Sequence, residues 1–203
     1  MSAAFWDRIA ERYAARPVSD TASYEATLER VRHWLRPEMQ VLELGCGTGS
    51  TAERLAGDVS QFTASDFSAE MIRIAESRCE AANLRFLCAG VGDALGGGSY
   101  DAVMAFNLLH LLDDLEGCLS QIHATLGKCG LFLSKTPCVA GKWYLRPAVW
   151  GLQKLGKAPS VRFLRPAQLE TAIREAGFEI LETGGYPAKL PNHFVVARKR
   201  PTT

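Results

Sequence analysis

The chain has 203 residues, of which 47% are hydrophobic and 22% charged, and its formal net charge is +1. This length fits a single hydrophobic core, so one domain is expected over residues 1–203. The near-neutral charge excludes a global field that would attract nucleic acid or an acidic partner. No run approaches the roughly 18 consecutive apolar residues of a membrane span.

Cysteine usage indicates the compartment. The chain contains no C-x-x-C pair and opens without the apolar core of a signal peptide. Most cysteines fall on expected strands or apolar helix faces, which favours buried thiols over a metal site. We therefore expect a reduced, cytoplasmic protein without a metal. The six cysteines are Cys46, Cys79, Cys88, Cys118, Cys129 and Cys138.

The first expected strand, residues 40–45, ends in an acid and a glycine-rich turn. Glu43 is followed by glycines at alternate positions, Gly45, Gly47 and Gly49. Glycine is required where a turn takes φ angles that other residues resist, or where a Cβ would occupy space that a ligand needs. The loop therefore predicts a ligand whose polar chain runs close to the backbone.

The spacing of this loop indicates the kind of nucleotide. A dinucleotide site reads G-x-G-x-x-G and places a pyrophosphate over a helix N-terminus, whereas this loop reads G-x-G-x-G. A carboxylate such as Glu43 would repel a pyrophosphate, yet it favours the ammonium group of an amino-acid moiety. Ser50 and Glu53 read as a capping box, so a helix is expected directly after the loop.

A second strand is expected from Gln61 to Asp66. An acid at the tip of the second strand of a βαβ unit suits the two hydroxyls of a ribose. Because the two strands lie side by side, Asp66 and the glycine loop should share one rim. Ser68 is the expected N-cap of the next helix, which carries apolar residues at helical spacing.

The rest of the chain alternates short β runs with helical stretches. This pattern predicts an α/β fold, in which helices cover both faces of a mainly parallel sheet. Helices are expected over 115–126 and from Pro166, which suits the first helical position, to Gly177. Further strands are expected at 84–89, 101–106, 131–135, 178–182 and 193–198.

Together these residues resemble the class I S-adenosylmethionine-dependent methyltransferases, whose first motif is E/D-x-G-x-G-x-G and whose second strand ends in a ribose-binding acid. Residues 5–13 are similar to the lead-in of the ubiquinone and menaquinone C-methyltransferase-like branch, which implies a helical lead-in over 1–36. The resemblance implies a Rossmann-like, seven-stranded sheet in the order 3-2-1-4-5-7-6. Four further segments match the family in order, namely 66–71, 100–103, 126–133 and 175–178.

The resemblance implies S-adenosylmethionine as cofactor and S-adenosylhomocysteine as product. Glu43 would face the methionine end, and Asp66 would bind the ribose. Phe67 and Met71 would pack against the adenine, although a core role fits Met71 equally well. The expected cofactor-binding set is Glu43, Gly45, Cys46, Gly47, Gly49, Asp66, Phe67, Met71, Gly90, Val91, Asp93 and Asn107.

The adenine end departs from the family pattern. Many relatives place G-D-A four residues beyond a strand aromatic, and counting from Phe86 this falls on Gly90, so the usual acid is missing. Either Asp93 or backbone groups of residues 89–91 would then accept from the adenine amine.

Two further roles follow from the resemblance. The segment from Asn107 to His110 would lie under the transferring methyl group, where His110 is either a general base or a structural histidine bonded to backbone. Trp6 and Tyr13 share one face of the leading helix, and they either form a lid over the cofactor or simply pack.

Residues 137–165 form a basic, aromatic insert, expected to be a lid over the acceptor. It carries six Lys or Arg residues, four aromatics and no acid. The aromatics favour an apolar body, and the cations favour an anionic group or an anionic membrane surface. A small quinone-like or lipid-like acceptor is therefore the first hypothesis.

Two alternatives to this function remain. A nucleic-acid methyltransferase is one, because cations interleaved with aromatics suit phosphates and stacked bases, although the neutral charge counts against it. A non-catalytic cofactor-binding module is the other.

Overall fold

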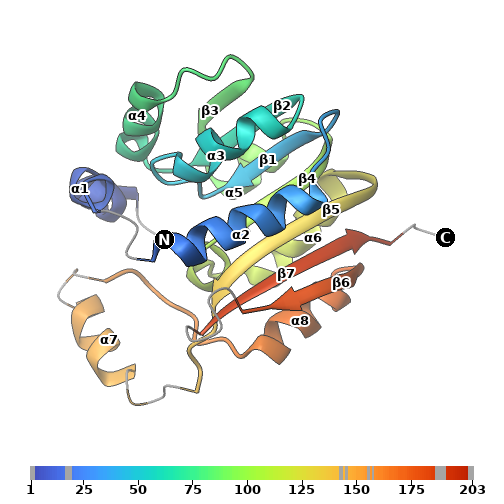
Figure 1. Cartoon of the computed structure of the whole chain (residues 1–203). Coiled ribbons are helices and arrows are strands. Elements are labelled where there is room, and N and C mark those ends of the chain that lie inside the picture. The colour runs from blue at the N-terminus through green and yellow to red at the C-terminus, as the bar shows by residue number, and fades with distance from the viewer. Residues whose placement is uncertain are drawn as a thin grey trace.

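The computed structural model describes residues 3–16, 20–141, 144, 146–154, 156, 158–185 and 191–200 (Figure 1). Its centre is a single sheet made of β1 (Gln40–Leu44), β2 (Gln61–Asp66), β3 (Leu84–Cys88), β4 (Tyr100–Phe106), β5 (Leu126–Pro137), β6 (Phe178–Gly184) and β7 (Asn192–Lys199). The helices are α1 (Ala3–Ala14), α2 (Thr21–Trp34), α3 (Ser50–Leu55), α4 (Ala69–Arg78), α5 (Val91–Leu95), α6 (Leu115–Thr125), α7 (Arg146–Lys154) and α8 (Pro166–Glu175), with 3-10 turns η1 (Ala56–Asp58) and η2 (Leu109–Leu111).

The strand order is β3-β2-β1-β4-β5-β7-β6. The five strands from β3 to β5 are parallel, whereas β7 pairs antiparallel with both β5 and β6. The predicted fold class and strand order are therefore confirmed. Because parallel strands end at one edge, the loops that follow β1, β2 and β4 meet on the same rim.

Helices cover both faces of the sheet, since its central strands are apolar on both sides. On one face, Leu28 of α2 and Leu55 of α3 are buried against β1, β2 and β4. On the other, Leu119 of α6 and Ile173 of α8 are buried against β4, β5 and β6. Figure 1 shows α2 and α3 on the viewer's side of the sheet.

Two element boundaries differ from the sequence prediction. The N-cap of α3 is Gly49, with a φ of 79° and no side-chain cap bond, so the predicted capping box of Ser50 and Glu53 is wrong. The turn needs a left-handed residue at this point, which leaves the cap position to glycine. β5 begins at Leu126 rather than at residue 131, because Leu126 is extended and pairs with Tyr100.

The expectation of buried thiols is only partly right. The structure buries Cys118 and Cys138, half-buries Cys46 and Cys79, and exposes Cys88 and Cys129. Cys88 is exposed because it ends β3, which is an edge strand. Within the described ranges, no group of three or more His, Cys, Asp or Glu side chains is placed to hold a metal ion.

The basic insert contains α7, which stands away from the sheet (Figure 1). Trp150 on this helix is 63% exposed. The Arg8 guanidinium of α1 donates a 2.6 Å hydrogen bond to the Gly156 carbonyl, which ties the insert to the first helix. Lys142, Trp143 and Lys157 lie outside the described residues. In the part of the chain described here, no helix is long and apolar enough to cross a bilayer.

Candidate active site

The glycine loop is a tight turn between β1 and α3. Gly45, Gly47 and Gly49 have φ angles of 68°, 55° and 79°, so all three are left-handed. The Cys46 amide donates to the Ser65 carbonyl at 2.9 Å, which fixes the turn against the end of β2. A Cβ on Gly49 would lie 2.8 Å from Phe86, whereas one on Gly47 would meet only the Tyr13 ring, at 3.8 Å. Gly47 therefore leaves free space where a ligand would approach.

Asp66, at the end of β2, is bonded to this loop. One carboxylate oxygen accepts from the Gly47 amide at 3.0 Å, and the other accepts from the Ser68 amide at 2.9 Å. Burial raises the pKa of Asp66, while backbone hydrogen bonds from Ser68, Gly47 and Phe67 oppose that rise. Three backbone donors leave one of the four lone-pair sites of the carboxylate open, so Asp66 can hold the loop and still accept from a ligand hydroxyl.

Glu43 is a buried acid without a full set of partners. The residue is 2% exposed, and its Oε2 atom has no hydrogen-bond partner among the described residues. Burial and the nearby Asp66 carboxylate raise the pKa of Glu43 to about 8. Ionising this buried acid is costly, so it holds its proton near pH 7, and a positively charged ligand group would favour the ionised carboxylate. The Glu43 carboxyl, beside that of Asp66, therefore fits a ligand with an ammonium or sulfonium group.

A cavity of about 340 Å³ opens beside Asp66. This volume is in the usual range for small-molecule sites. Among the residues predicted for the cofactor, Gly45, Asp66, Phe67, Gly90 and Val91 line the cavity. The remaining lining residues are Ser65, Ala89, Gly92, Leu108, Leu112, Asp113, Asp114, Cys118 and Gln121.

Seven of the twelve predicted cofactor residues are not among those that line this cavity, namely Glu43, Cys46, Gly47, Gly49, Met71, Asp93 and Asn107. Asp93 is exposed on α5, whereas backbone groups of residues 89–92 line the cavity, which favours the backbone alternative for the adenine. Met71 is 1% exposed and packs with Ala10 and Ile74, which favours its core alternative.

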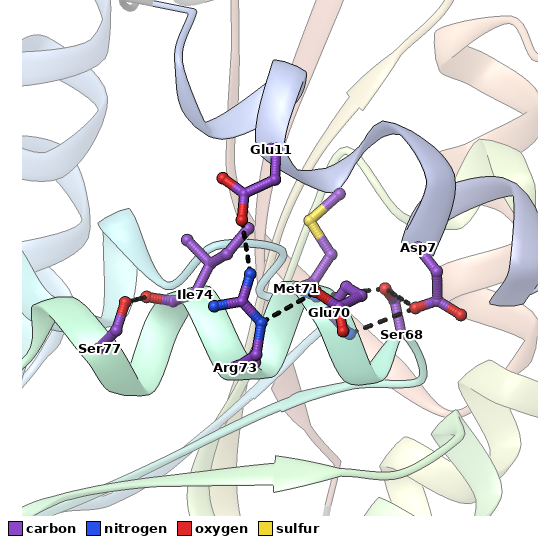
Figure 2. Close-up of polar contacts among 8 residues, drawn as sticks. All are labelled: Asp7, Glu11, Ser68, Glu70, Met71, Arg73, Ile74 and Ser77. Carbon is purple, nitrogen blue, oxygen red and sulfur yellow. Dashed lines mark hydrogen bonds and ion pairs between the residues drawn. The ribbon is translucent and has the colours of Figure 1, made fainter.

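Helix α1 lies over the cofactor loop. The Ser68 hydroxyl donates to Asp7 at 2.6 Å, and Arg73 bridges Glu70 and Glu11, so α1 is fastened to α4 (Figure 2). This attachment brings Tyr13 near the glycine loop. Burial and the charges of Asp66 and Glu43 raise the pKa of Tyr13.

Trp6 contacts the Tyr13 ring edge-on, with centroids 6.5 Å apart. The pair therefore packs within α1, which is the second of the two alternatives, and a lid over the cofactor stays a prediction.

The end of β4 carries the predicted methyl-transfer segment. Asn107 has a φ of 54°, and its amide donates to the Lys135 carbonyl at 2.7 Å. Non-glycine residues rarely take this conformation. The few that do are concentrated at functional sites. His110 follows on η2, where its Nδ1 atom is buried and has no hydrogen-bond partner in the described part of the chain. Burial lowers the pKa of His110 to about 4, so the imidazole is neutral near pH 7 and is a weak base.

Sequence reasoning missed several polar residues of the site. Asp113, Asp114 and Gln121 line the cavity from the start and middle of α6. Lys135 is not in the cavity lining, but it lies near the same edge of the sheet, two residues after the apolar run of β5, and donates to the Thr27 hydroxyl at 2.8 Å. Of these residues, only Lys135 could have been found from the sequence, because it is a lysine near the end of an apolar strand at the ligand-binding edge of the sheet.

The sequence matches the family described as a methyltransferase domain over residues 11–183. The chain belongs to the class I S-adenosylmethionine-dependent methyltransferases. This methyltransferase domain is also 30% identical, over 113 residues, to the malonyl-[acyl-carrier protein] O-methyltransferase of Bacillus anthracis. That alignment covers 55% of the chain and 42% of the Bacillus enzyme, so the matched part spans less than half of that relative.

Solved structures share the fold of this methyltransferase domain. DhpI in complex with SAH has a TM-score of 0.79 at 23% identity, with 98% of this chain and 96% of that chain covered. The magnesium protoporphyrin IX methyltransferase of Synechocystis PCC 6803 has a TM-score of 0.72 at 19% identity, with 97% and 93% covered. The narrower ubiquinone and menaquinone branch stays a prediction.

Proposed function

We propose that this domain transfers a methyl group from S-adenosylmethionine to a small acceptor with an apolar, lipid-like or quinone-like body. The observation that carries the cofactor assignment is Glu43, a buried carboxylate with an unpaired oxygen, placed just before a loop of three left-handed glycines. A cationic ligand whose chain crosses that loop meets both requirements. The SAH bound to DhpI is a ligand of this chemical type.

The residues of the chain divide the work of binding. Glu43 holds the cationic methionine end, and Asp66 accepts from the ribose hydroxyls. Phe67 and the backbone of residues 89–92 enclose the adenine. S-adenosylmethionine, when bound, supplies a methyl group on a positively charged sulfur. The protein's main contribution is alignment of that methyl with the acceptor, an effect that reaches ~7–11 kcal/mol in well-oriented reactions.

His110 contributes at the acceptor end. With a pKa of about 4, its neutral imidazole is a weak proton acceptor, so it suits an acceptor that is already an anion or that needs only a hydrogen bond. Strong deprotonation of a neutral alcohol is not the chemistry that this environment favours.

The insert and the acceptors that two relatives are named for support a lipid-like substrate. The exposed aromatics Tyr144 and Trp150 offer an apolar surface. The Bacillus relative acts on a malonyl group of an acyl-carrier protein, and the Synechocystis enzyme acts on magnesium protoporphyrin IX. A malonyl group and a protoporphyrin both carry carboxylates, and the porphyrin adds a large apolar body, which agrees with the proposal.

Incubation with methyl-labelled S-adenosylmethionine and a cell extract tests this function. Labelled product that partitions into organic solvent is expected, and the Asp66→Ala protein is the negative control. Label in nucleic acid instead would favour the nucleic-acid alternative. Tight binding of S-adenosylhomocysteine with no labelled product from any extract fraction would favour the non-catalytic module.

A further inference from the structure

Lys135 is a half-buried cation without a counter-charge. Its ammonium donates one hydrogen bond, to the neutral Thr27 hydroxyl at 2.8 Å, and no ion pair of Lys135 occurs among the described residues. Thr27 in turn donates to the Ser23 carbonyl at 2.8 Å. An ammonium has three donors, so two remain for a further partner.

The nearest acid does not neutralise Lys135. Asp20 acts on Lys135 only through its field, because its two carboxylate oxygens accept from the Ser23 amide and hydroxyl at 3.0 and 2.6 Å. Burial lowers the pKa of Lys135, which shows that its charge is held at a cost. A partly buried ammonium in this state favours an incoming anion.

The sheet register places Lys135 at the acceptor side of the rim. Lys135 pairs with Phe106, the last residue of β4, and its carbonyl accepts from Asn107. In the sheet register Glu43 pairs with Met104, and Met104 pairs with Leu133. Lys135 is two residues beyond Leu133, and side chains two residues apart on a strand lie on the same face, so Glu43 and Lys135 share one face of the sheet. Standard strand spacings put the Glu43 and Lys135 backbones about 12 Å apart.

This face carries an acid at one end, a lysine at the other and apolar groups between them, and a bound cation would favour the ionised form of the acid. Glu43 is the acidic end, and Lys135 is the basic end. Phe106 and Tyr24 are partly buried in the same cluster and lie on this face of the fold. A methyl donor held at Glu43 would therefore meet an acceptor whose apolar body contacts Phe106 and whose anionic group reaches Lys135.

We propose that the methyl acceptor carries an anionic oxygen group, a carboxylate or phosphonate, that binds the Lys135 ammonium. This inference rests on the proposed function, because it takes the neighbouring rim as the cofactor site. It narrows the acceptor class to apolar oxyanions. Lys135 recognises the acceptor, and no proton transfer is assigned to it.

Binding of octyl compounds to the protein saturated with S-adenosylhomocysteine tests the inference. Octanoate, octylphosphonate and octanol share one apolar chain and differ in the head group, and calorimetry measures each affinity. At least one octyl anion is expected to bind, and to bind more tightly than octanol. Lys135→Met is expected to lower the affinity for that anion by at least about tenfold, while Lys135→Arg retains most of the affinity.

Lys199 supplies a matched control. Lys199 also donates a hydrogen bond, to the Leu126 carbonyl at 2.7 Å. Leu126 is the first residue of β5, so this contact lies at the opposite end of the strand from Lys135. Lys199→Met should change no octyl affinity. Melting curves verify that each variant is folded.

Three outcomes would overturn the inference. They are equal affinity for octanol and the anions, anion binding that Lys135→Met does not change, and no binding of either anion. A loss of S-adenosylhomocysteine affinity in Lys135→Met would assign the lysine to the cofactor's own carboxylate and overturn it too. Failure of the unaltered protein to bind S-adenosylhomocysteine would instead contradict the proposed function.

Discussion

The Asp66 carboxylate accepts a hydrogen bond from the Gly47 amide at 3.0 Å, so the acid of β2 and the glycine loop after β1 form one unit. The same side chain also accepts from the Ser68 amide at the start of α4. Ligand contact and loop geometry therefore depend on one carboxylate.

Asp66→Ala is expected to lower S-adenosylhomocysteine affinity by about 10- to 150-fold, because hydrogen bonds to a charged group are worth ~1.5–3 kcal/mol. It should also lower the melting temperature, since the amides of Gly47 and Ser68 lose their acceptor. Asp101→Ala is the control, because Asp101 accepts from the Gln40 amide at the far end of the sheet. Calorimetry and thermal melts measure both properties. Unchanged affinity in folded Asp66→Ala would remove Asp66 from the ribose site.

Gly47→Ala and Gly49→Ala are expected to fail in different ways. A Cβ on Gly47 meets no atom closer than 3.8 Å, so this variant should fold with a loss of ~1 kcal/mol and bind cofactor poorly. A Cβ on Gly49 would lie within 2.9 Å of both Phe86 and Ala75, so that variant should lose stability first. Gly57→Ala, with open space around it, is the neutral control. Parent-like binding by Gly47→Ala would make the loop an ordinary turn.

The sheet was predictable because each strand carries a local apolar signal, and because the glycine loop and Asp66 follow two of those strands directly. The start of β5 was not predictable, because Leu126 pairs with Tyr100, which is a contact between residues far apart in the sequence. The capping box was misread because Ser50 and Glu53 fit the pattern, while the conformation that the loop imposes on Gly49 is a tertiary demand.

The candidate site divides in the same way. Gly45 and Asp66 line the cavity from the two strand ends that their motifs follow, whereas Asp113 and Gln121 reach it only because α6 packs beside α5. No periodicity in the sequence reports that packing. Lys135 is similar, since its missing counter-charge is a property of its neighbours and not of its own segment.

Glu43 should make both stability and binding depend on pH. Its pKa is 4.5 in the unfolded reference and about 8 in the fold, so the folded protein holds a proton that the unfolded chain has lost between these values. Stability contributed by this group therefore falls as pH rises from about 4.5 through 8. Glu43→Gln should remove the fall and be more stable by on the order of 5 kcal/mol above pH 8.

Cofactor binding should release that proton. A cation beside Glu43 favours the carboxylate, so near pH 7 the affinity for S-adenosylhomocysteine should rise with pH, by at most about tenfold per unit. Calorimetry in buffers with different ionisation enthalpies measures the release, and Glu43→Gln should release nothing. Equal heats in phosphate and Tris for the unaltered protein would contradict the prediction.

His110 should affect acid stability more than the neutral pH profile. Its pKa falls from 6.5 to about 4 on burial, so the fold loses stability as pH drops from 6.5 through 4, on the order of 2 kcal/mol. His110→Phe should flatten that loss, whereas replacing the exposed His33 with Asn should not. Urea unfolding at pH 4.5, 5.5 and 7 measures the difference.

Turnover gives a second reading of His110. If the neutral imidazole accepts from the acceptor, His110→Ala lowers turnover by ~10²–10⁴ without changing cofactor affinity. The rate should show no inflection between pH 6 and 8 that depends on His110. An inflection near 6.5 that disappears in His110→Asn would contradict the lowered pKa, and a loss below about tenfold at every pH would make the residue structural.

The insert is expected to bind anionic membranes weakly through α7. Trp150 is 63% exposed, and the Lys154 ammonium lies 5.7 Å from the centre of its ring, so an aromatic and a cation share one surface. Each cation near an anionic surface contributes ~1 kcal/mol, so Lys154→Glu should lower partitioning onto anionic liposomes by about fivefold or more. Trp150→Ala should lower this partitioning because apolar contact is lost. The control is Lys128→Glu, since Lys128 is exposed at the other end of β5.

Sedimentation with anionic and neutral liposomes measures the effect, and raised salt should weaken binding because the charges are exposed. Equal partitioning onto both lipids, or none onto either, would contradict a membrane role for the insert.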